Sequence, residues 1–139
     1  MTGTSPSPRV LLVEDSALVV AALRLLLEET GYRVSAAATV REAIDRAIDD
    51  APDVMLLDLS LPDGSGLDVL SALVARGVVA RVTVAVTGHD DPALRDRCLA
   101  AGCADVLIKP IAPLALPGQI RAWLEAVEKH DRHGAPREP

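Results

Sequence analysis

The sequence predicts an α/β fold with a five-stranded parallel sheet that is covered by helices on both faces. Short runs rich in Val, Leu and Ile alternate with longer segments of helical spacing, the pattern of successive β-α units. The third and fourth runs are almost continuously apolar, as expected of central strands buried on both faces. With 139 residues, 50% of them hydrophobic, the chain fits one domain whose core contains almost no aromatic residues.

The strands are recognised by where their apolar runs stop. Most of the runs give way directly to a charged or polar residue, or to a segment with Gly or Pro, which marks the loop that follows. We therefore expect strands at residues 9–13, 33–37, 53–58, 81–87 and 105–108.

Capping signals locate the first two helices. Ser16 is a suitable N-cap for the first helix, which ends near Gly31. Thr39 and Glu42 predict a capping box, in which hydroxyl and carboxylate satisfy each other's free backbone donors. The second helix follows this box, and its expected apolar face consists of Val40, Ala43, Ile44, Ala47 and Ile48.

The last three helices have weaker boundaries. A third helix is expected over residues 66–76. The fourth begins with Asp91 as cap and Pro92 in its first turn, and it ends at Gly102. The fifth begins near Pro117, since Pro is tolerated in a first turn, and contains Ile120, Trp123, Leu124 and Val127.

Composition limits the environment and the partners of the chain. The net charge is −6 and the sequence pI about 4.9, which disfavours direct binding of nucleic acid. No leader peptide or membrane span is recognisable, so we expect a soluble, cytoplasmic protein in which Cys98 and Cys103 are reduced. Residues 1–8 and 130–139 are rich in Pro and polar residues, so we expect disordered tails around a domain at 9–129.

Functional side chains follow four of the five strands. Asp58 closes the third strand, and the acidic pair Glu14 and Asp15 follows the first. Thr87 ends the fourth strand and Lys109 follows the fifth. The carboxyl ends of parallel strands meet at one edge of the sheet, where open α/β folds place their sites. Three acids, a hydroxyl and an ammonium group there suit a divalent cation and a phosphoryl group.

Together these segments resemble the response-regulator receiver domain of two-component signalling over about residues 9–129. The resemblance rests on Glu14-Asp15, on the segment Asp58-Leu59-Ser60-Leu61-Pro62-Asp63-Gly64-Ser65-Gly66, on Thr87-Gly88 and on Lys109-Pro110. Each motif alone is weak, whereas all four in this order are specific. The resemblance implies a flavodoxin-like, doubly wound sheet of strand order 2-1-3-4-5 with five helices, as in the chemotaxis receiver.

The resemblance also implies a role for each site residue. Asp58 is the expected phosphoacceptor. A histidine kinase or a phosphotransfer protein is expected to donate the phosphoryl group. Glu14, Asp15, Asp58 and the backbone carbonyl of Ser60 are expected to hold Mg²⁺, with Mn²⁺ as the alternative cation. Thr87 is expected to hydrogen-bond the phosphoryl group and Lys109 to pair with it. The family also implies that the Lys109-Pro110 bond is cis.

Two positions depart from the family pattern or add to it. Receivers usually carry an aromatic residue three positions before the lysine, where this chain has Val106, so the aromatic step of the usual switch is in doubt. His89 lies two residues after Thr87, at a position that borders the phosphoryl group in the family. The alternative interpretation is that His89 is simply an exposed loop residue.

The downstream target is expected on the face of the fourth helix, fifth strand and fifth helix. Trp123 either lies on that face or, as we favour, packs against the sheet.

The leading functional hypothesis is a stand-alone receiver, monomeric or weakly dimeric, that signals through protein contacts and binds neither nucleic acid nor membrane. A phosphate relay or sink without conformational readout is an alternative, and a phosphorylation-independent binding module is another. We do not expect the protein to act as an enzyme on an external substrate. It is expected to catalyse only the phosphorylation and dephosphorylation of its own Asp58. Aspartyl-phosphate hydrolases usually carry a second acid two residues after the nucleophile, where this chain has Ser60.

Overall fold

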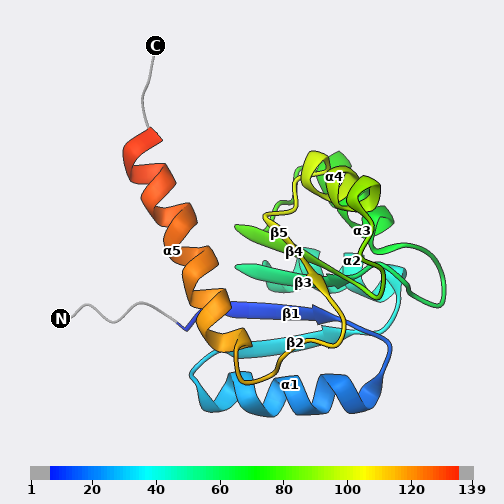
Figure 1. Ribbon diagram of the computed structural model, residues 1–139, viewed down its shortest axis with the longest axis horizontal. Helices are drawn as coiled ribbons and strands as arrows, with labels where there is room; N and C mark the ends of the chain where they lie inside the picture. The colour runs from blue at the N-terminus through cyan, green and yellow to red at the C-terminus, as the bar shows by residue number, and fades with distance from the viewer. Residues whose placement is uncertain (1–6, 135–139) are drawn as a thin grey trace.

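Five parallel strands form one sheet in the order β2-β1-β3-β4-β5 (Figure 1). The computed structural model describes residues 7–134. The expected order is confirmed, and each strand begins and ends within one residue of its predicted limits. The central strands β3 and β4 are buried along their whole length. The strands are β1 (Arg9–Val13), β2 (Arg33–Ala37), β3 (Val54–Asp58), β4 (Val82–Thr87) and β5 (Asp105–Ile108).

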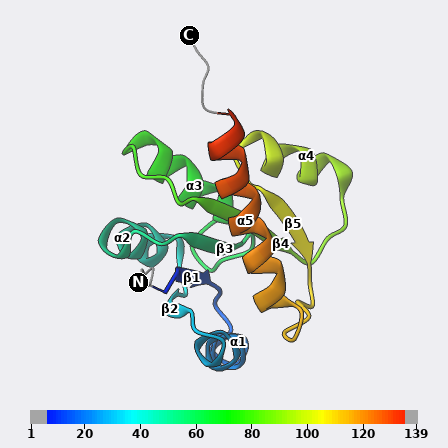
Figure 2. The same cartoon turned by 90° about the vertical axis from the view of Figure 1, so that its left-hand side faces the viewer.

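The helices form two layers, one on each face of the sheet (Figure 2). Successive strand residues point to opposite faces, so Val10 and Leu12 join one core and Leu11 and Val13 the other. Helices α1 and α5 cover the core that contains Val10 and Leu12. Helices α2, α3 and α4 cover the core that contains Leu11 and Val13. The helices are α1 (Ala17–Glu29), α2 (Val40–Asp50), α3 (Gly66–Ala75), α4 (Pro92–Ala100) and α5 (Leu116–Gly134).

The helix N-termini are capped largely as the sequence indicates. The Ser16 hydroxyl accepts from the Val19 N–H at 3.3 Å, and the Asp91 carboxylate accepts from the Ala93 N–H at 3.0 Å. The capping box of α2 is only half formed. The Thr39 hydroxyl accepts from the Glu42 N–H, but the Glu42 carboxylate accepts from the Ala38 N–H, one residue earlier than expected.

Two expectations about helices α2 and α5 are wrong. Ile48 is 44% exposed, whereas Ala43 and Ala47 are buried and the other two members of the expected face are partly buried against the core. Helix α5 continues to Gly134, so the expected domain end at 129 falls inside it. The residues after 129 contain no Pro or Gly before Gly134, and nothing in the backbone stops the helix earlier. Residues 1–6 and 135–139 of the expected tails lie outside the described residues.

Trp123 packs against the core, as we favoured from the sequence, and both cysteines are buried. Trp123 is half-buried against the core that contains Ile120 and Leu124, and its indole N–H donates to Asp105 at 3.2 Å. Cys98 and Cys103 are buried free thiols, and burial raises the pKa of Cys103 to about 11. The Lys109-Pro110 bond is cis. Within residues 7–134, no helix combines the length and apolarity that crossing a membrane requires.

Gly66 allows α3 to start directly against the end of β3. A β-carbon at this position would overlap the Asp58 carbonyl oxygen and lie 2.9 Å from Leu57 Cγ. We expect Gly66→Ala to lower the free energy of unfolding by about 1–3 kcal/mol, the usual cost of overpacking, measured by urea denaturation.

Gly118 provides the matched control for this substitution. It lies in α5, and a β-carbon added there would have no neighbouring atom within 4 Å. Gly118→Ala should therefore leave stability unchanged or raise it by up to about 1 kcal/mol. Equal destabilisation by both substitutions would contradict a specific close approach at Gly66.

Candidate functional site

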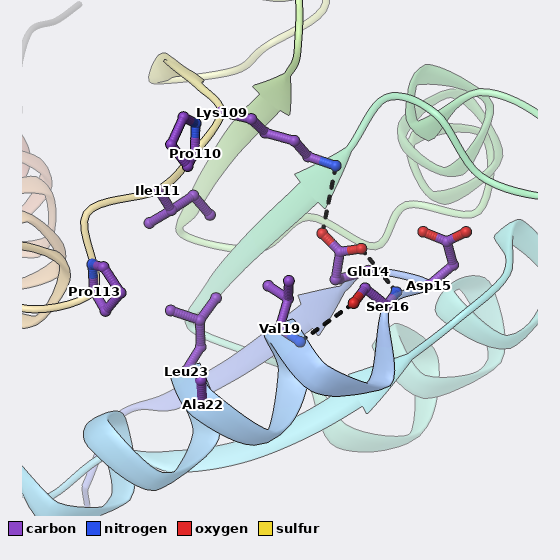
Figure 3. Close-up of a pocket in the computed structure, with 10 residues that line it drawn as sticks. All are labelled: Glu14, Asp15, Ser16, Val19, Ala22, Leu23, Lys109, Pro110, Ile111 and Pro113. Atoms are coloured by element: carbon purple, nitrogen blue, oxygen red, sulfur yellow. Dashed lines mark hydrogen bonds and ion pairs between the residues drawn. The ribbon is translucent and has the colours of Figure 1, made fainter.

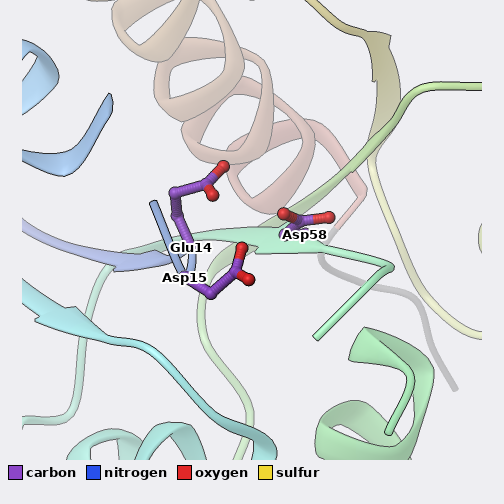
Figure 4. Close-up of side chains that lie close together, drawn as sticks. All are labelled: Glu14, Asp15 and Asp58. Atoms are coloured by element: carbon purple, nitrogen blue, oxygen red, sulfur yellow. The ribbon is translucent and has the colours of Figure 1, made fainter. Parts of the chain in front are cut away.

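Three carboxylates meet at the carboxyl edge of the sheet (Figure 4). Glu14 and Asp15 follow the end of β1, and Asp58 is the last residue of the neighbouring strand β3. One oxygen from each lies within 4.8 Å of the others. Asp58 is only 2% exposed, whereas Asp15 lies open to solvent. The acidic cluster is therefore buried on the side of Asp58 and open to solvent on the side of Asp15.

Lys109 supplies the positive charge that faces this cluster. Its Nζ lies 2.7 Å from Asp58 Oδ2 and 3.5 Å from Glu14 Oε1. The Lys109 N–H donates to the Thr87 carbonyl at 2.8 Å, which fixes the residue at the end of β5 beside β4. One ammonium group against three carboxylates leaves an excess of negative charge, which a cation can offset.

Backbone donors orient the two more buried carboxylates. The Ser60 N–H donates to Asp58 Oδ1 at 2.9 Å, and the Ser16 N–H donates to Glu14 Oε2 at 2.8 Å. Asp58 is thus held by Lys109 on one oxygen and by the chain after β3 on the other. Glu14 lies at the start of α1, where the helix dipole also favours a negative charge.

Thr87 lies at the same edge, at the end of β4. Its side chain is buried, and its oxygen accepts a hydrogen bond from the His89 N–H at 3.1 Å. The hydroxyl proton of Thr87 is not used in this bond and can be donated to another acceptor. The side chain of His89 is exposed.

The loop after Asp58 is anchored by residues that the sequence did not single out. Asp63 accepts from the N–H groups of Val40 at 2.7 Å and Arg41 at 3.2 Å, so the loop is tied to the start of α2. These two hydrogen bonds lower the pKa of Asp63. Because the partners are 23 and 22 residues apart in sequence, no local pattern could have shown this contact.

A pocket of about 550 Å³ opens beside the acidic cluster, between α1 and the loop after β5 (Figure 3). Val19 and Leu23 of α1 form one wall, and Ile111 and Pro113 form the other. Glu14 and Lys109 also line the pocket, and one of the dashed lines in Figure 3 marks their ion pair. The charged site therefore borders a largely apolar surface.

Burial and the neighbouring charges shift the pKa values of this group. Burial raises the pKa of Glu14, and the charge of Asp58 adds to the rise, while the Ser16 N–H and Lys109 oppose it. Burial acts to lower the pKa of Lys109, but its hydrogen bond and ion pair with Asp58, together with Glu14, raise it overall. Burial, more than repulsion between carboxylates, is the main cause of the Glu14 shift.

Comparison with known proteins identifies the domain. The family model described as the response regulator receiver domain matches residues 10–121. The chain belongs to the response regulator receiver domain family. It is 35% identical over 113 residues to the transcriptional regulatory protein KdpE of Mycobacterium tuberculosis, covering 81% of this chain and 49% of that protein. It is 38% identical over 125 residues to the transcriptional regulatory protein PrrA of Mycobacterium leprae, covering 88% and 52%.

Solved receiver structures agree with this assignment. A CheY-like response regulator receiver domain protein from Methanospirillum hungatei has a TM-score of 0.80 and 29% identity, covering 89% of this chain and 98% of that one. The chemotaxis protein CheY4 of Vibrio cholerae has a TM-score of 0.75 and 25% identity, covering 84% and 98%. The receiver spans about half the length of the curated relatives it matches.

Magnesium binding and phosphorylation are typical of this family, and the donor set of this receiver fits Mg²⁺. The cluster consists of carboxylate oxygens, the ligands that this hard cation prefers, and it carries more negative than positive charge. Asp15 adds a ligand that is exposed to solvent, which suits an ion that keeps part of its hydration shell.

The raised pKa of Glu14 gives a direct test of the site's electrostatics. We expect Glu14 in metal-free protein to titrate above its ordinary value of 4.5, and Lys109→Met to raise its pKa further by removing a positive charge. Carboxyl-detected NMR titration measures both. The folded state then binds this proton more tightly than the unfolded chain, so the stabilising contribution is full below the ordinary pKa. It is lost as pH rises through the folded value.

Lys129→Met is the control, because Lys129 lies on α5 and takes part in no ion pair among the described residues. It should leave the Glu14 titration unchanged. A lower Glu14 pKa in Lys109→Met than in the wild type would contradict the described geometry.

Proposed function

We propose that this receiver accepts a phosphoryl group on Asp58 from a histidine kinase or a phosphotransfer protein. The observation that carries the proposal is the placement of Asp58, a buried carboxylate at the end of β3, bonded to Lys109 and grouped with two further acids. A phosphoacceptor needs this combination of a nucleophilic oxygen and countercharges in fixed positions.

In the proposed transfer, a carboxylate oxygen of Asp58 attacks phosphorus and forms an acyl phosphate. The bond between phosphorus and the donor breaks, and the donor, an imidazole of the partner or the acetate of acetyl phosphate, leaves with the bonding electrons. Lys109 faces the carboxylate at 2.7 Å, close enough to pair with an oxygen of the incoming group. Thr87, at the end of the neighbouring strand, can donate its hydroxyl proton to another oxygen.

The metal ligands in this proposal are Glu14, Asp15, Asp58 and the backbone carbonyl of Ser60. Bound Mg²⁺ would supply the positive charge that a phosphoryl group requires beside three carboxylates. Glu14 and Asp58 are already oriented by backbone donors, so little side-chain freedom remains to be lost on binding. Mn²⁺ has the same preference for oxygen ligands and is an expected substitute.

We further propose that the phosphorylated receiver signals by protein contact through α4, β5 and α5. The exposed Leu99 and Ile108 offer apolar contact area on this face. The relatives KdpE and PrrA are named as transcriptional regulatory proteins, which is a property of those longer chains. Turnover of an external phosphate ester is not expected, since Ser60 stands where aspartyl-phosphate hydrolases usually carry their general acid.

The phosphoacceptor is tested by intact-mass analysis after incubation with acetyl phosphate. We expect one added phosphoryl group in the presence of Mg²⁺, little without it, and none in Asp58→Asn. Asp91→Asn is the matched control, because Asn caps a helix as well as Asp and Asp91 lies outside the acidic cluster. Labelling of Asp58→Asn to the same extent as Asp91→Asn would refute the assignment.

A phosphate relay or sink without conformational readout is the second candidate, favoured by Val106. This residue is buried in the core with Cys98 and Cys103, and a valine is too short to alternate between a buried and an exposed position as a larger aromatic can. Phosphorylation of such a receiver would change the site without necessarily changing the α4-β5-α5 face.

NMR spectra with Mg²⁺ and beryllofluoride, an analogue of the phosphoryl group, separate the two candidates. A relay should show amide shifts confined to the loops around Asp58, Thr87 and Lys109. A switch should also shift amides along α4 and α5. The Asp58→Asn variant should show neither pattern, and shifts that persist in it would mean that the analogue acts elsewhere.

A further inference from the structure

A second hollow lies at the opposite end of the sheet from the acidic cluster. Its volume is about 360 Å³, and β1, β2 and α2 contribute its lining. Arg9 and Arg33 begin β1 and β2, whereas Asp58 ends β3, so the parallel strands separate the two sites by their full length (Figure 1). The lining residues are Arg9, Arg33, Val34, Ser35, Arg46 and Asp50.

Three arginines and one acidic residue line this hollow. Arg9 and Arg33 are direct partners in the β1-β2 register, which puts both side chains on the face that α2 covers. Like charges directly opposite each other on adjacent strands destabilise a sheet. Arg46 adds a third positive charge from α2. None of the ion pairs among residues 7–129, whose side chains the structure describes, includes any of the three arginines.

Two of these arginines are held in place by neutral groups. Arg9 Nη1 donates to the Asp50 carbonyl at 2.6 Å, and Arg33 donates through Nε and Nη2 to the Ser7 carbonyl at 3.1 and 3.0 Å. A carbonyl fixes a guanidinium group without cancelling its charge. Each guanidinium has five N–H donors, so these bonds leave further donors for an anion.

Asp53, which lies close to Arg9, has contacts of its own. Asp53 accepts from the Arg9 backbone N–H at 2.8 Å and lies 3.9 Å from Arg81. Its ion pair is with Arg81, and it forms none with the three arginines of the hollow. Asp50, whose carbonyl binds Arg9, contributes the single carboxylate of the lining.

We propose that this arginine pocket binds a soluble small molecule that carries a phosphate or diphosphate group. The planar fork of a guanidinium matches phosphate oxygens in bidentate geometry. The volume falls at the lower end of the usual range for small-molecule sites, about 300–1,000 Å³, which fits a phosphate ester better than a bare ion. A net charge of −6 repels anions from most of the surface, so a local cluster of positive charge defines where one is bound.

The test is an NMR titration of the full chain with pyrophosphate in metal-free buffer. We expect saturable amide shifts centred on Arg33, Ser35 and Arg46. Arg46→Gln should weaken binding by about tenfold or more, since it removes charge-assisted hydrogen bonds. The side chain of Arg46 makes no hydrogen bond or ion pair among residues 7–129, so its loss should not disturb folding. Arg121→Gln, on α5 and remote from the pocket lining, is the matched control and should bind as the wild type does.

Three results would overturn the proposal. They are the absence of saturable shifts in the wild type, equal affinity of Arg46→Gln and Arg121→Gln, and shifts centred on Thr87 and Lys109 at the other edge. Binding to vesicles of an anionic phospholipid without a response to pyrophosphate would also refute a soluble ligand. Arg46→Gln should still be labelled by acetyl phosphate, so the pocket and the proposed phosphoacceptor can fail independently.

Discussion

The arrangement of the carboxyl edge depends on one interaction, the contact of Lys109 with the buried carboxylate of Asp58. A charge removed from water is costly unless it is paired and hydrogen-bonded, and Asp58 is 2% exposed. Lys109, 51 residues later in sequence, approaches to 2.7 Å, and the Ser60 N–H binds the other oxygen. The pair can form only if β3, β4 and β5 are in their observed register, so the site and the sheet specify each other.

The same edge remains electrostatically unbalanced, and this imbalance links it to function. Glu14 is held in the ionised form less readily than in water, chiefly because it is buried, whereas the side chain of Asp15 lies open to solvent. A cation bound there relieves repulsion, and a phosphoryl group increases it. If one conformation of the receiver binds the cation or the phosphoryl group more tightly, that ligand stabilises this conformation. By linkage, a partner protein that prefers the same conformation favours phosphorylation in return.

The sequence predicted the strands and the convergence of the acids because both depend on short-range features. Apolar runs have clear ends, and the carboxyl ends of parallel strands must meet at one edge. The anchoring of Asp63 to α2, the close approach of Gly66 to β3 and the cluster of Arg9, Arg33 and Arg46 depend on contacts between distant segments. The exposure of Ile48 was missed for a related reason, because a helical period gives the apolar face but not how closely the helix packs.

The polarity of the β-α unit explains part of the charge distribution at the two ends of the sheet. Helix N-termini, with their partial positive charge, lie at the carboxyl edge, where the Ser16 N–H binds Glu14. Helix C-termini lie at the other edge, where Arg9 binds the last carbonyl of α2. This accounts for an acid at one end and for Arg9 at the other. It does not account for Arg33 directly opposite Arg9, or for Arg46, which adds positive charge to the same hollow without an ion-pair partner among residues 7–129. The anion proposed for this hollow would supply the missing countercharge for these two residues.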